Sequence, residues 1–581
     1  MANFFTDNED IKFLFDHIDM AELATVQENG FAEPDASSYA PRDAADAVDN
    51  YRRILTIIGQ IAAEHIAPRS DAVDQEGNTL NADGTVTFGK NVRENLDVLA
   101  QADMMGFTLP RKYGGLNFPT TVYTMANEIV SRADCSLMNL FGLQGIADTI
   151  YAFAEDSVRD EYLPKFANGS VTGAMVLTEP DAGSDLQAVQ LRAWQDEDGN
   201  WRLTGVKRFI TNGCGEVLLV LARSEAGTSD GRGLSMFLAD RSSRIRVRHL
   251  EEKLGIHGSP TCELVFDDAP AKLIGERQLG LIRYVFSLMN GARLGIAGQS
   301  LGVAEAAYRL ARTYAHSRKQ FGVPIERLPA VAELVTDMKI HIEAARALTY
   351  ETARICDIEN NNLRVIEFNA PKDPAELKRR KETARTLKRL NGMLTPMSKY
   401  YGSEMCVKVA SDAIQVLGGS GYIKDYPAER YLRDARITTI YEGTSQLQVV
   451  AAVRGVCSGT FEKRVDELEK ATYTDLLLVA LQAKLAEGRT LVQKAIVFVK
   501  EKGADYMDLS GRRLVDSAIA ILAGHLLLQH AAKNDRKKAV ARRFIDSRMA
   551  DIRRDTDVVC SGDTAPLSEY ELLAGPVAST R

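Results

Sequence analysis

The sequence predicts an α+β protein in which a small β domain lies between helical blocks. Apolar residues recur at helical spacing near both ends of the chain, whereas short strand-like segments separated by turn residues fill its middle. A chain of 581 residues is also too long for a single hydrophobic core. We therefore expect a helical N-terminal domain, a middle antiparallel β-barrel domain, a helical-bundle C-terminal domain and an extra helical C-terminal tail.

The first helical domain is predicted at residues 44–170, after an N-terminal extension of residues 1–43. In "NYRRILTIIGQIAAEHI", Ile54, Ile57 and Ile58 follow the spacing of one helix face. The loop "LPRKYGGLNFP", with paired glycines and two prolines, interrupts the helical pattern.

The middle domain is predicted at residues 171–279. Its strand-like segments are "VQLRAW", "WRLTGVKRFITNG" and "EVLLVLA", and the turn sequence "DEDGN" separates the first two. Evenly spaced short strands without helices between them favour an antiparallel sheet or barrel.

Helical patterns return after the middle domain and continue to the end of the chain. We place the C-terminal domain at residues 280–459 and an additional helical C-terminal domain at residues 460–581. The apolar part of "LVDSAIAILAGHLLLQHAAKNDRKKAVARRF" needs a packing surface. The segment 371–390 contains eight basic and three acidic residues, and we expect it to interrupt or lengthen a helical hairpin.

Composition argues against a nucleic-acid-binding, disulfide-bonded, secreted or membrane-spanning protein. Hydrophobic residues make up 45% and charged residues 26% of the chain, as in ordinary globular proteins, and the net charge of -8 argues against nucleic acid as the main partner. Seven cysteines without a C-x-x-C pair indicate reduced thiols. The N-terminus does not resemble a signal peptide, and no run of about 18 apolar residues predicts a membrane span. We expect a cytoplasmic protein.

Several familiar catalytic motifs do not occur in the sequence. There is no phosphate-binding P-loop, no H-E-x-x-H and no G-x-S-x-G, and the eight histidines form no pair at metal-ligand spacing, so we expect no metal site. The sequence "LGGSGY" follows the helical stretch "EMCVKVASDAIQV", which favours a glycine pair that ends a helix over a dinucleotide-binding loop.

Five short segments far apart in the sequence remain: "LTEPDAGSD", "KRFITNG", "SRKQFG", "QVLGGSGY" and "IYEGTSQLQ". Each alone is compatible with a turn or a helix cap. Together and in this order they resemble the acyl-CoA dehydrogenase family, from about residue 44 to residue 459. The resemblance implies an oxidoreductase acting on CH–CH groups, with FAD between the last two domains and a neighbouring subunit. It further implies that an acyl-CoA becomes a trans-2-enoyl-CoA, that flavin N5 accepts the hydride, and that electrons pass to electron-transfer flavoprotein.

In "IYEGTSQLQ", Glu442 matches the family's catalytic base. A thioester α-proton is too weakly acidic for a solvated carboxylate, so the base must be desolvated, which raises its pKa. The resemblance assigns enolate stabilisation to a flavin hydroxyl and the backbone N–H of Glu442, and Gly443 would allow close approach to the ligand. Some members carry the base on a long helix, where this chain has Gly291 and Ala292, so Glu442 is left as the matching base.

The resemblance assigns FAD contacts to residues of the same segments. They are Met175, Leu177, Thr178, Ser184, Phe209, Thr211, Arg318, Gln320, Phe321, Gln415, Gly418, Gly419, Thr444 and Gln446. Thr178 would lie near flavin N5, and Phe209 stands where the family usually has Trp. Arg318 would pair with the pyrophosphate. Gln415 and the two glycines match residues that contact FAD across a subunit interface, so the resemblance implies a homo-oligomer.

The resemblance also implies substrate contacts, at Ser184, Asn290, Arg293 and Gly443. Arg293 matches an arginine near the adenosine or phosphates of CoA, and Asn290 replaces a common aspartate. By count, Met138 takes the place of the arginine that holds the distal carboxylate in glutaryl-CoA dehydrogenases. This favours an apolar acyl tail and a role in fatty acid β-oxidation, and leaves acyl length and branching open.

The flanking regions resemble the long bacterial acyl-CoA dehydrogenases that include methylmercaptopropionyl-CoA dehydrogenases. We expect a homodimer, because the helical tail would replace part of the tetramer contact of shorter relatives. Two alternatives stay open. One is an acyl-CoA oxidase that uses O₂. The other is a DNA-binding homologue that uses the basic runs at residues 372–389 and 533–543, although such runs are usually solvated helix faces.

Overall fold

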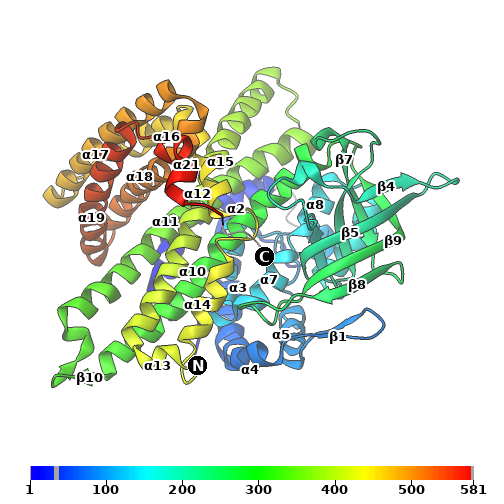
Figure 1. Ribbon diagram of the computed structural model, residues 1–581, viewed down its shortest axis with the longest axis horizontal. Coiled ribbons are helices and arrows are strands. Elements are labelled where there is room, and N and C mark those ends of the chain that lie inside the picture. Colours follow the sequence, from blue (N-terminus) through cyan, green and yellow to red (C-terminus); the bar gives the residue numbers. More distant parts are fainter. Residues whose placement is uncertain (1, 32–37, 369, 578–581) are drawn as a thin grey trace.

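A computed structural model describes residues 2–31, 38–368 and 370–577 of the chain. Figure 1 shows the β domain at one side of the molecule, long helices in the centre, and the helices of the C-terminal tail at the other side. The order of helical block, β block and helical block confirms the predicted fold class.

The N-terminal extension forms helices α1 (Glu9–His17) and α2 (Met20–Gln27). Asn8 caps α1, because its side chain accepts hydrogen bonds from the backbone N–H groups of Asp10 and Ile11. The extension is part of the core of the protein, since Ile11 and other apolar residues of α1 are buried against the following helices.

The helical N-terminal domain follows. Its helices are α3 (Ala44–Ile61), α4 (Ser70–Glu76), α5 (Lys90–Gln101), α6 (Thr120–Ala133), α7 (Cys135–Leu143), α8 (Ile146–Phe153) and α9 (Asp156–Ala167). A small ribbon of β1 (Thr79–Leu80) and β2 (Val86–Thr87) interrupts them, which the sequence did not indicate. Ile58 of α3 is buried, whereas Ile57 is 38% exposed, so the buried face is narrower than the apolar pattern.

The middle domain is a closed barrel. Its strands are β3 (Gly173–Val176), β4 (Arg192–Gln195), β5 (Trp201–Thr211), β6 (Val217–Arg223), β7 (Leu234–Asp240), β8 (Ile245–Leu250) and β9 (Thr261–Ile274). The order β6-β4-β5-β9-β7 closes because β7 also pairs with β6. All these pairings are antiparallel except β4 with β6, which meet in one parallel pair, and β3 adds to β6 in parallel.

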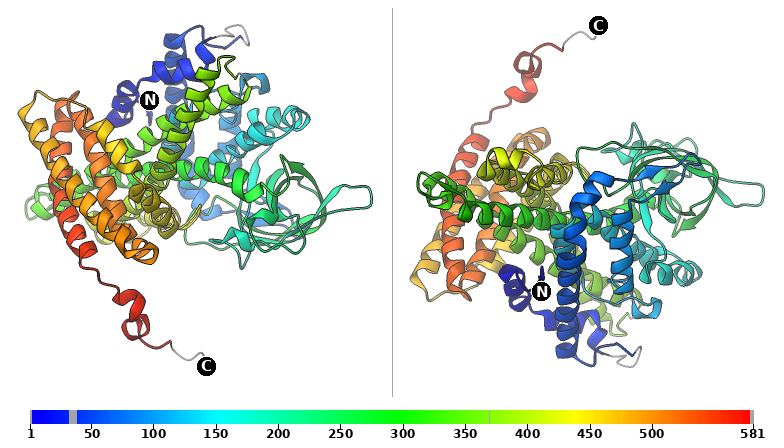
Figure 2. Two further views of the ribbon diagram at one scale, coloured as in Figure 1. Left: turned by 90° about the horizontal axis from the view of Figure 1, so that it is seen from above. Right: turned by 90° about the horizontal axis from the view of Figure 1, so that it is seen from below.

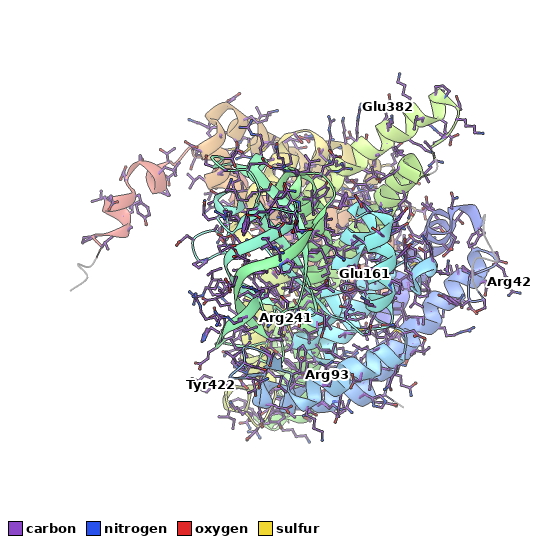
Figure 3. The ribbon with its side chains drawn as sticks, turned by 90° about the vertical axis from the view of Figure 1, so that its right-hand side faces the viewer. Arg42, Arg93, Glu161, Arg241, Glu382 and Tyr422 are labelled. Atoms are coloured by element: carbon purple, nitrogen blue, oxygen red, sulfur yellow. The ribbon has the colours of Figure 1, made fainter. Side chains whose placement is uncertain are left out.

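The C-terminal domain is a bundle of long helices. Its elements are α10 (Phe286–Ser317), the hairpin β10 (Lys319–Gln320) and β11 (Val323–Pro324), α11 (Pro329–Phe368), α12 (Pro374–Leu417), α13 (Gly419–Tyr422), α14 (Ala428–Ile437) and α15 (Ser445–Cys457). The basic segment 371–390 lengthens the hairpin of α11 and α12, whose end carries Glu382 and projects from the body (Figure 3). Gly418, at φ +62°, ends α12, as expected for the glycine pair.

The C-terminal tail, residues 460–581, begins with α16 (Thr460–Leu468), α17 (Leu476–Lys502), α18 (Ala504–Ala531) and α19 (Asp535–Cys560). Residues of α17, α18 and α19 share one hydrophobic core with α12 and α15, so the tail packs on the protein's own body as predicted. Among the described residues, α18 is long and apolar enough to cross a membrane, but 89% of its most apolar window is buried. Two short helices, α20 (Ala565–Ser568) and α21 (Tyr570–Ala574), extend away from the body (Figure 2).

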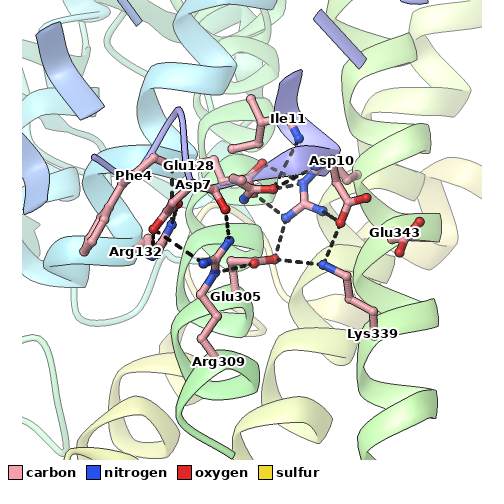
Figure 4. A network of polar contacts seen from close by, with 12 residues as sticks. Phe4, Asp7, Asp10, Ile11, Glu128, Arg132, Glu305, Arg309, Lys339 and Glu343 are labelled. Carbon is pink, nitrogen blue, oxygen red and sulfur yellow. Dashed lines mark hydrogen bonds and ion pairs between the residues drawn. The ribbon is translucent and has the colours of Figure 1, made fainter. Parts of the chain in front are cut away.

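A buried ion network connects both ends of the chain to the central helices. Asp10 of α1 forms ion pairs with Lys339 of α11, at 2.6 Å, and with Lys537 of α19. Arg346, which is fully buried on α11, lies 2.6 Å from Glu128 in the same network. Figure 4 shows Asp10 and Lys339 pointing toward one another beside Glu128. Because a buried charge is costly unless it is paired, these contacts favour one arrangement of the flanking segments.

Candidate active site

Glu442 lies on a sharp turn between α14 and α15. Glu442 has φ +55° and Gly443 has φ +88°, so two successive residues are left-handed. This conformation is sparsely populated by non-glycine residues and persists only where the surroundings hold it. An added Cβ on Gly443 would also lie 2.5 Å from Nε2 of Gln448, so this side chain, which hydrogen-bonds to the turn, would have to move.

Side chains from three helices hold the carbonyl oxygens of this turn. Gln448 Nε2 of α15 donates to the Glu442 oxygen at 3.1 Å and to the Gly443 oxygen at 3.0 Å. Lys399 Nζ of α12 donates to the Gly443 oxygen at 2.8 Å. Arg293 Nε of α10 donates to the Glu442 oxygen at a longer 3.5 Å. The turn is therefore fixed from α10, α12 and α15 together.

The carboxylate of Glu442 is able to accept a proton near neutral pH. Burial raises its pKa to about 7, although Arg293 and Lys399 act in the opposite direction. Among the described residues, no cation lies within 4.0 Å of its oxygens. A pKa close to neutrality is the value at which a carboxylate serves best as a general base.

The backbone N–H of Glu442 is also available. Of the residues that the structure describes, none accepts a hydrogen bond from it, whereas the carbonyl oxygens of Glu442 and Gly443 accept bonds from the neighbouring side chains. An unpaired N–H beside a carboxylate can bind the oxygen of a ligand carbonyl.

A polar cluster supports the turn from behind. The Tyr441 hydroxyl lies 3.1 Å from Oδ1 of Asn139 and also hydrogen-bonds to Gln299. Gln299 Nε2 donates to Asn139 Oδ1 at 2.9 Å, which joins α10 to α7. Met138 is buried on α7, and its Cε lies 3.5 Å from the position of an added Cβ on Gly295. The wall beside α10 is therefore apolar at Met138.

The predicted substrate residues divide into two places. Arg293 Nη1 donates to Asn290 Oδ1 at 3.4 Å, and both lie on α10 next to the turn that carries Glu442 and Gly443. Ser184 is exposed on a loop of the barrel domain. The structure thus brings three of the predicted substrate residues together beside Glu442 and places Ser184 on a different domain.

A second group of predicted residues forms one edge of the barrel. The backbone N–H of Arg208 donates to the Thr178 oxygen at 3.0 Å, which places the loop after β3 beside β5. Phe209 has φ +60° at an irregularity of β5 and is 53% exposed. Lys207 Nζ is buried and donates to the Leu177 oxygen at 2.6 Å. Met175 lies in β3, and Thr211 is the last residue of β5.

A third group lies at the opposite end of the helical bundle. It comprises Arg318, Gln320, Phe321, Gln415, Gly418 and Gly419. Tyr314 connects the end of α10 to this region, because its hydroxyl lies 3.5 Å from Oγ of Ser420. Figure 1 shows β10 and α13 far from the barrel. Within one chain, this group is therefore far from Thr178 and Phe209 of the barrel domain. Thr444 and Gln446 belong to neither group, because they follow Glu442 closely in the sequence.

Sequence reasoning did not identify Lys399, Gln448 or Glu404. Glu404 accepts a hydrogen bond from Oγ of Ser445, at 2.6 Å, and from Arg512 of α18, at 2.7 Å. The sequence could have indicated Lys399, because it is a lone cation in the largely apolar stretch "MLTPMSKYYG" of α12. No grouping of three or more metal-ligating side chains occurs in the described part of the chain.

Comparison with known families finds matches along most of the chain. The model "Acyl-CoA dehydrogenase, N-terminal domain" matches residues 49–170, and the corresponding middle-domain model matches residues 174–269. The C-terminal domain model matches residues 282–372 and 375–456, and "Acyl-CoA dehydrogenase C terminal" matches residues 457–561.

Individual proteins show the same similarity. An acyl-CoA dehydrogenase of Bacillus subtilis is 34% identical over 363 residues, which cover 61% of this chain and 88% of the relative. The 3-methylmercaptopropionyl-CoA dehydrogenase of Ruegeria pomeroyi is 33% identical over 431 residues, or 69% of each protein. An acyl-CoA dehydrogenase of Bacillus anthracis, solved in complex with FAD, covers 91% of this chain with a TM-score of 0.75. Its 22% identity, over 89% of that chain, shows similarity of fold alone.

Proposed function

Because the chain belongs to the acyl-CoA dehydrogenase family, we propose that it oxidises an acyl-CoA thioester to the trans-2-enoyl-CoA, with Glu442 as the α-proton base. The observation that carries the proposal is the left-handed Glu442 turn. It presents a carboxylate with a pKa of about 7 and an unpaired backbone N–H side by side. Proton abstraction next to a carbonyl requires both of these groups.

The cofactor of the enzyme is FAD, and the residues present fit it. Phe209 offers an exposed aromatic face beside Thr178, as an isoalloxazine ring requires. At the other end of the bundle, Arg318 follows the end of α10, where the Tyr314 hydroxyl reaches Ser420 beside the two glycines. An added Cβ on Gly418 or Gly419 would meet no atom within 4 Å. Such open glycines allow close approach of a pyrophosphate. Bound FAD supplies the hydride acceptor.

Two copies of the chain are needed for a complete cofactor site in this proposal. The barrel edge and the Arg318 group lie on different sides of one chain, so a second copy would supply the missing group. We propose a homodimer, supported by the packing of α17 to α19 against α12 and α15, which covers that face of the bundle. Light scattering that shows a stable tetramer would refute this part of the proposal.

Residues of the chain divide the work of the first step. Glu442 receives the α-proton on its carboxylate, and its backbone N–H donates to the thioester oxygen as negative charge develops there. Arg293, Gln448 and Lys399 keep the turn in place through its carbonyls. Asn290 would orient Arg293 at the CoA end of the site, since the two side chains are hydrogen-bonded.

The proposed substrate has an uncharged acyl tail. Met138 is buried beside α10 and offers no charge to a distal carboxylate. The relative from Ruegeria pomeroyi carries the name of a thioether acyl-CoA, which agrees with an apolar pocket. We place the enzyme in acyl-CoA degradation of the β-oxidation type, in the cytoplasm, with electron-transfer flavoprotein as electron acceptor.

A panel of acyl-CoA thioesters tests this function. The FAD-loaded protein is mixed anaerobically with straight, branched, thioether and dicarboxylyl acyl-CoAs, and bleaching of the flavin is recorded. We expect bleaching with one or more uncharged acyl chains and none with glutaryl-CoA. If no acyl-CoA bleaches the flavin, the proposed function is wrong. Peroxide formation in air, compared with reduction of electron-transfer flavoprotein, distinguishes an oxidase from a dehydrogenase.

A further inference from the structure

We propose that Lys399 is a positioning residue for the catalytic base: its ammonium donates to the Gly443 carbonyl and so holds the turn that carries Glu442. This inference rests on the proposed role of Glu442. It assigns a function to a side chain of α12 that lies 44 residues from Gly443 in the sequence.

The position of Lys399 demands an explanation because a buried ammonium is costly. The residue is 0% exposed, and no carboxylate of the described chain lies within 4.0 Å of its Nζ. The hydrogen bond of 2.8 Å to the Gly443 oxygen is the contact that compensates it directly. Lysine is rarely buried without an ion pair, so a side chain held in this way points to a role in the site.

The charged groups around Lys399 come from three elements. Arg293 reaches the site from α10, Glu404 lies on α12 itself, and Glu442 lies on the turn before α15. Glu404 is already engaged by Ser445 and Arg512, at 2.6 and 2.7 Å. Lys399 and Arg293 are the two cations that act on the Glu442 carboxylate.

The sign of the effect follows from this arrangement. Burial raises the pKa of Glu442 to about 7, and the positive charges of Arg293 and Lys399 limit the rise. Without the Lys399 charge, the pKa of Glu442 would be higher, so less of the base would be ionised at neutral pH. The base would recover at higher pH, where the carboxyl group loses its proton. Burial also lowers the pKa of Lys399 to about 7, so its positive charge acts on Glu442 chiefly below neutral pH, which is the acid limb of the rate.

Lys399→Met and Lys399→Arg separate charge from structure. In stopped-flow bleaching by an active acyl-CoA, measured across about pH 5.5 to 9, we expect Lys399→Met to shift the acid limb of the rate to higher pH. The rate at pH 7 would fall and would recover toward that of the wild type as the pH rises to about 9. Lys399→Arg retains the charge and should keep the midpoint near that of the wild type. Lys408→Met, at an exposed position of the same helix, is the matched control and should change nothing.

A second readout does not depend on turnover. Hydrogen exchange of the segment around residues 438–448 should accelerate in Lys399→Met and not in Lys408→Met, because one anchor of the turn is lost. A rate loss of equal size at every pH, without a shifted midpoint, would overturn the charge role. Unchanged exchange would overturn the anchoring role. If no acyl-CoA bleaches the flavin of the wild-type protein, the proposed function itself is wrong. That outcome is distinct from the two results that would overturn the role of Lys399.

Discussion

Asp10, near the start of the chain, and Lys537, near its end, form a buried ion pair across 527 residues. Lys537 also pairs with Glu343 of α11 at 2.6 Å, so the N-terminal extension and the C-terminal tail meet on the central helix hairpin. The two flanks that distinguish this chain from shorter relatives are therefore coupled to one another.

Asp10→Asn should destabilise the whole protein. Burial raises the pKa of the Asp10 carboxyl, but Lys339, Lys537 and Arg346 outweigh burial and hold the pKa well below its usual range. Removal of this charge takes one carboxylate from Lys339 and Lys537, which keep Glu305 and Glu343 as partners. Breaking a buried ion pair in this way typically costs about 3 to 5 kcal/mol, and the remaining partners favour the lower end of that range. Urea denaturation measures the loss, with the exposed Glu9→Gln on the same helix as the control.

The same ion network predicts acid sensitivity. Because the folded pKa of Asp10 is depressed, its contribution to stability is present above the unfolded pKa of about 3.8 and is lost as the pH falls below that value. A wild-type protein that loses no more stability than Asp10→Asn between neutral and acid pH would contradict this assignment.

Glu442→Gln should bind FAD and acyl-CoA but lose most flavin reduction. The amide keeps the size of the side chain and the backbone N–H, and it removes the oxygen that accepts the α-proton. The loss should be about 10²- to 10⁴-fold, the usual contribution of general-base catalysis. Single-turnover bleaching under anaerobic conditions measures it, and a rate near that of the wild type would exclude Glu442 as the base.

The rate of flavin reduction should depend on pH with a midpoint near neutrality. Since burial raises the pKa of Glu442 to about 7, the carboxylate is protonated and inactive below this pH and ionised above it. The rate at saturating acyl-CoA should therefore rise as pH increases through about 7. A rate that is constant down to about pH 5 would mean that the base has an ordinary pKa.

Gly443→Ala should damage both stability and turnover. The substitution places a Cβ at φ +88° and 2.5 Å from Gln448 Nε2, so the turn must shift or store strain of about 1 to 3 kcal/mol. Gly392→Ala on α12 is the matched control, because its Cβ would meet no atom within 4 Å and alanine favours a helix. Equal thermal stability of the two variants would contradict the strained turn.

Removal of the chain after Gly562 should leave the fold unchanged. None of the residues in α20 and α21 is buried, and the hydrogen bonds of the described residues 563–577 lie within that region or its preceding turn. We expect Tm to change by less than about 2 °C. A larger decrease in calorimetry would show that this segment is covered in solution.

The fold class could be predicted from the sequence because it follows from local patterns. Apolar spacing predicts the helices around Ile58, and turn residues between short strands predict the barrel. The parallel addition of β3 to β6 could not be predicted in this way, since strand pairing depends on which segments meet in space.

The candidate site divides in the same manner. Five short segments in order indicated the family and, with it, FAD, and the segment around Glu442 supplied the candidate base. A sequence motif could not predict that Arg318 and Gly418 lie on the opposite side of the chain from Phe209, because their distance depends on how the domains pack. Their assignment to FAD remains a prediction.

The α–β–α order, the family and the candidate base could be predicted from the chain, because each follows from short segments whose residues are neighbours and from the order of those segments. The distant side chains that support the base and join the flanks became visible only in the folded protein. Lys399 reaches Gly443 across 44 residues, and Asp10 reaches Lys537 across 527. The physical reason is that a buried charge is stabilised by whatever partners the packed helices place around it, and packing depends on the whole chain.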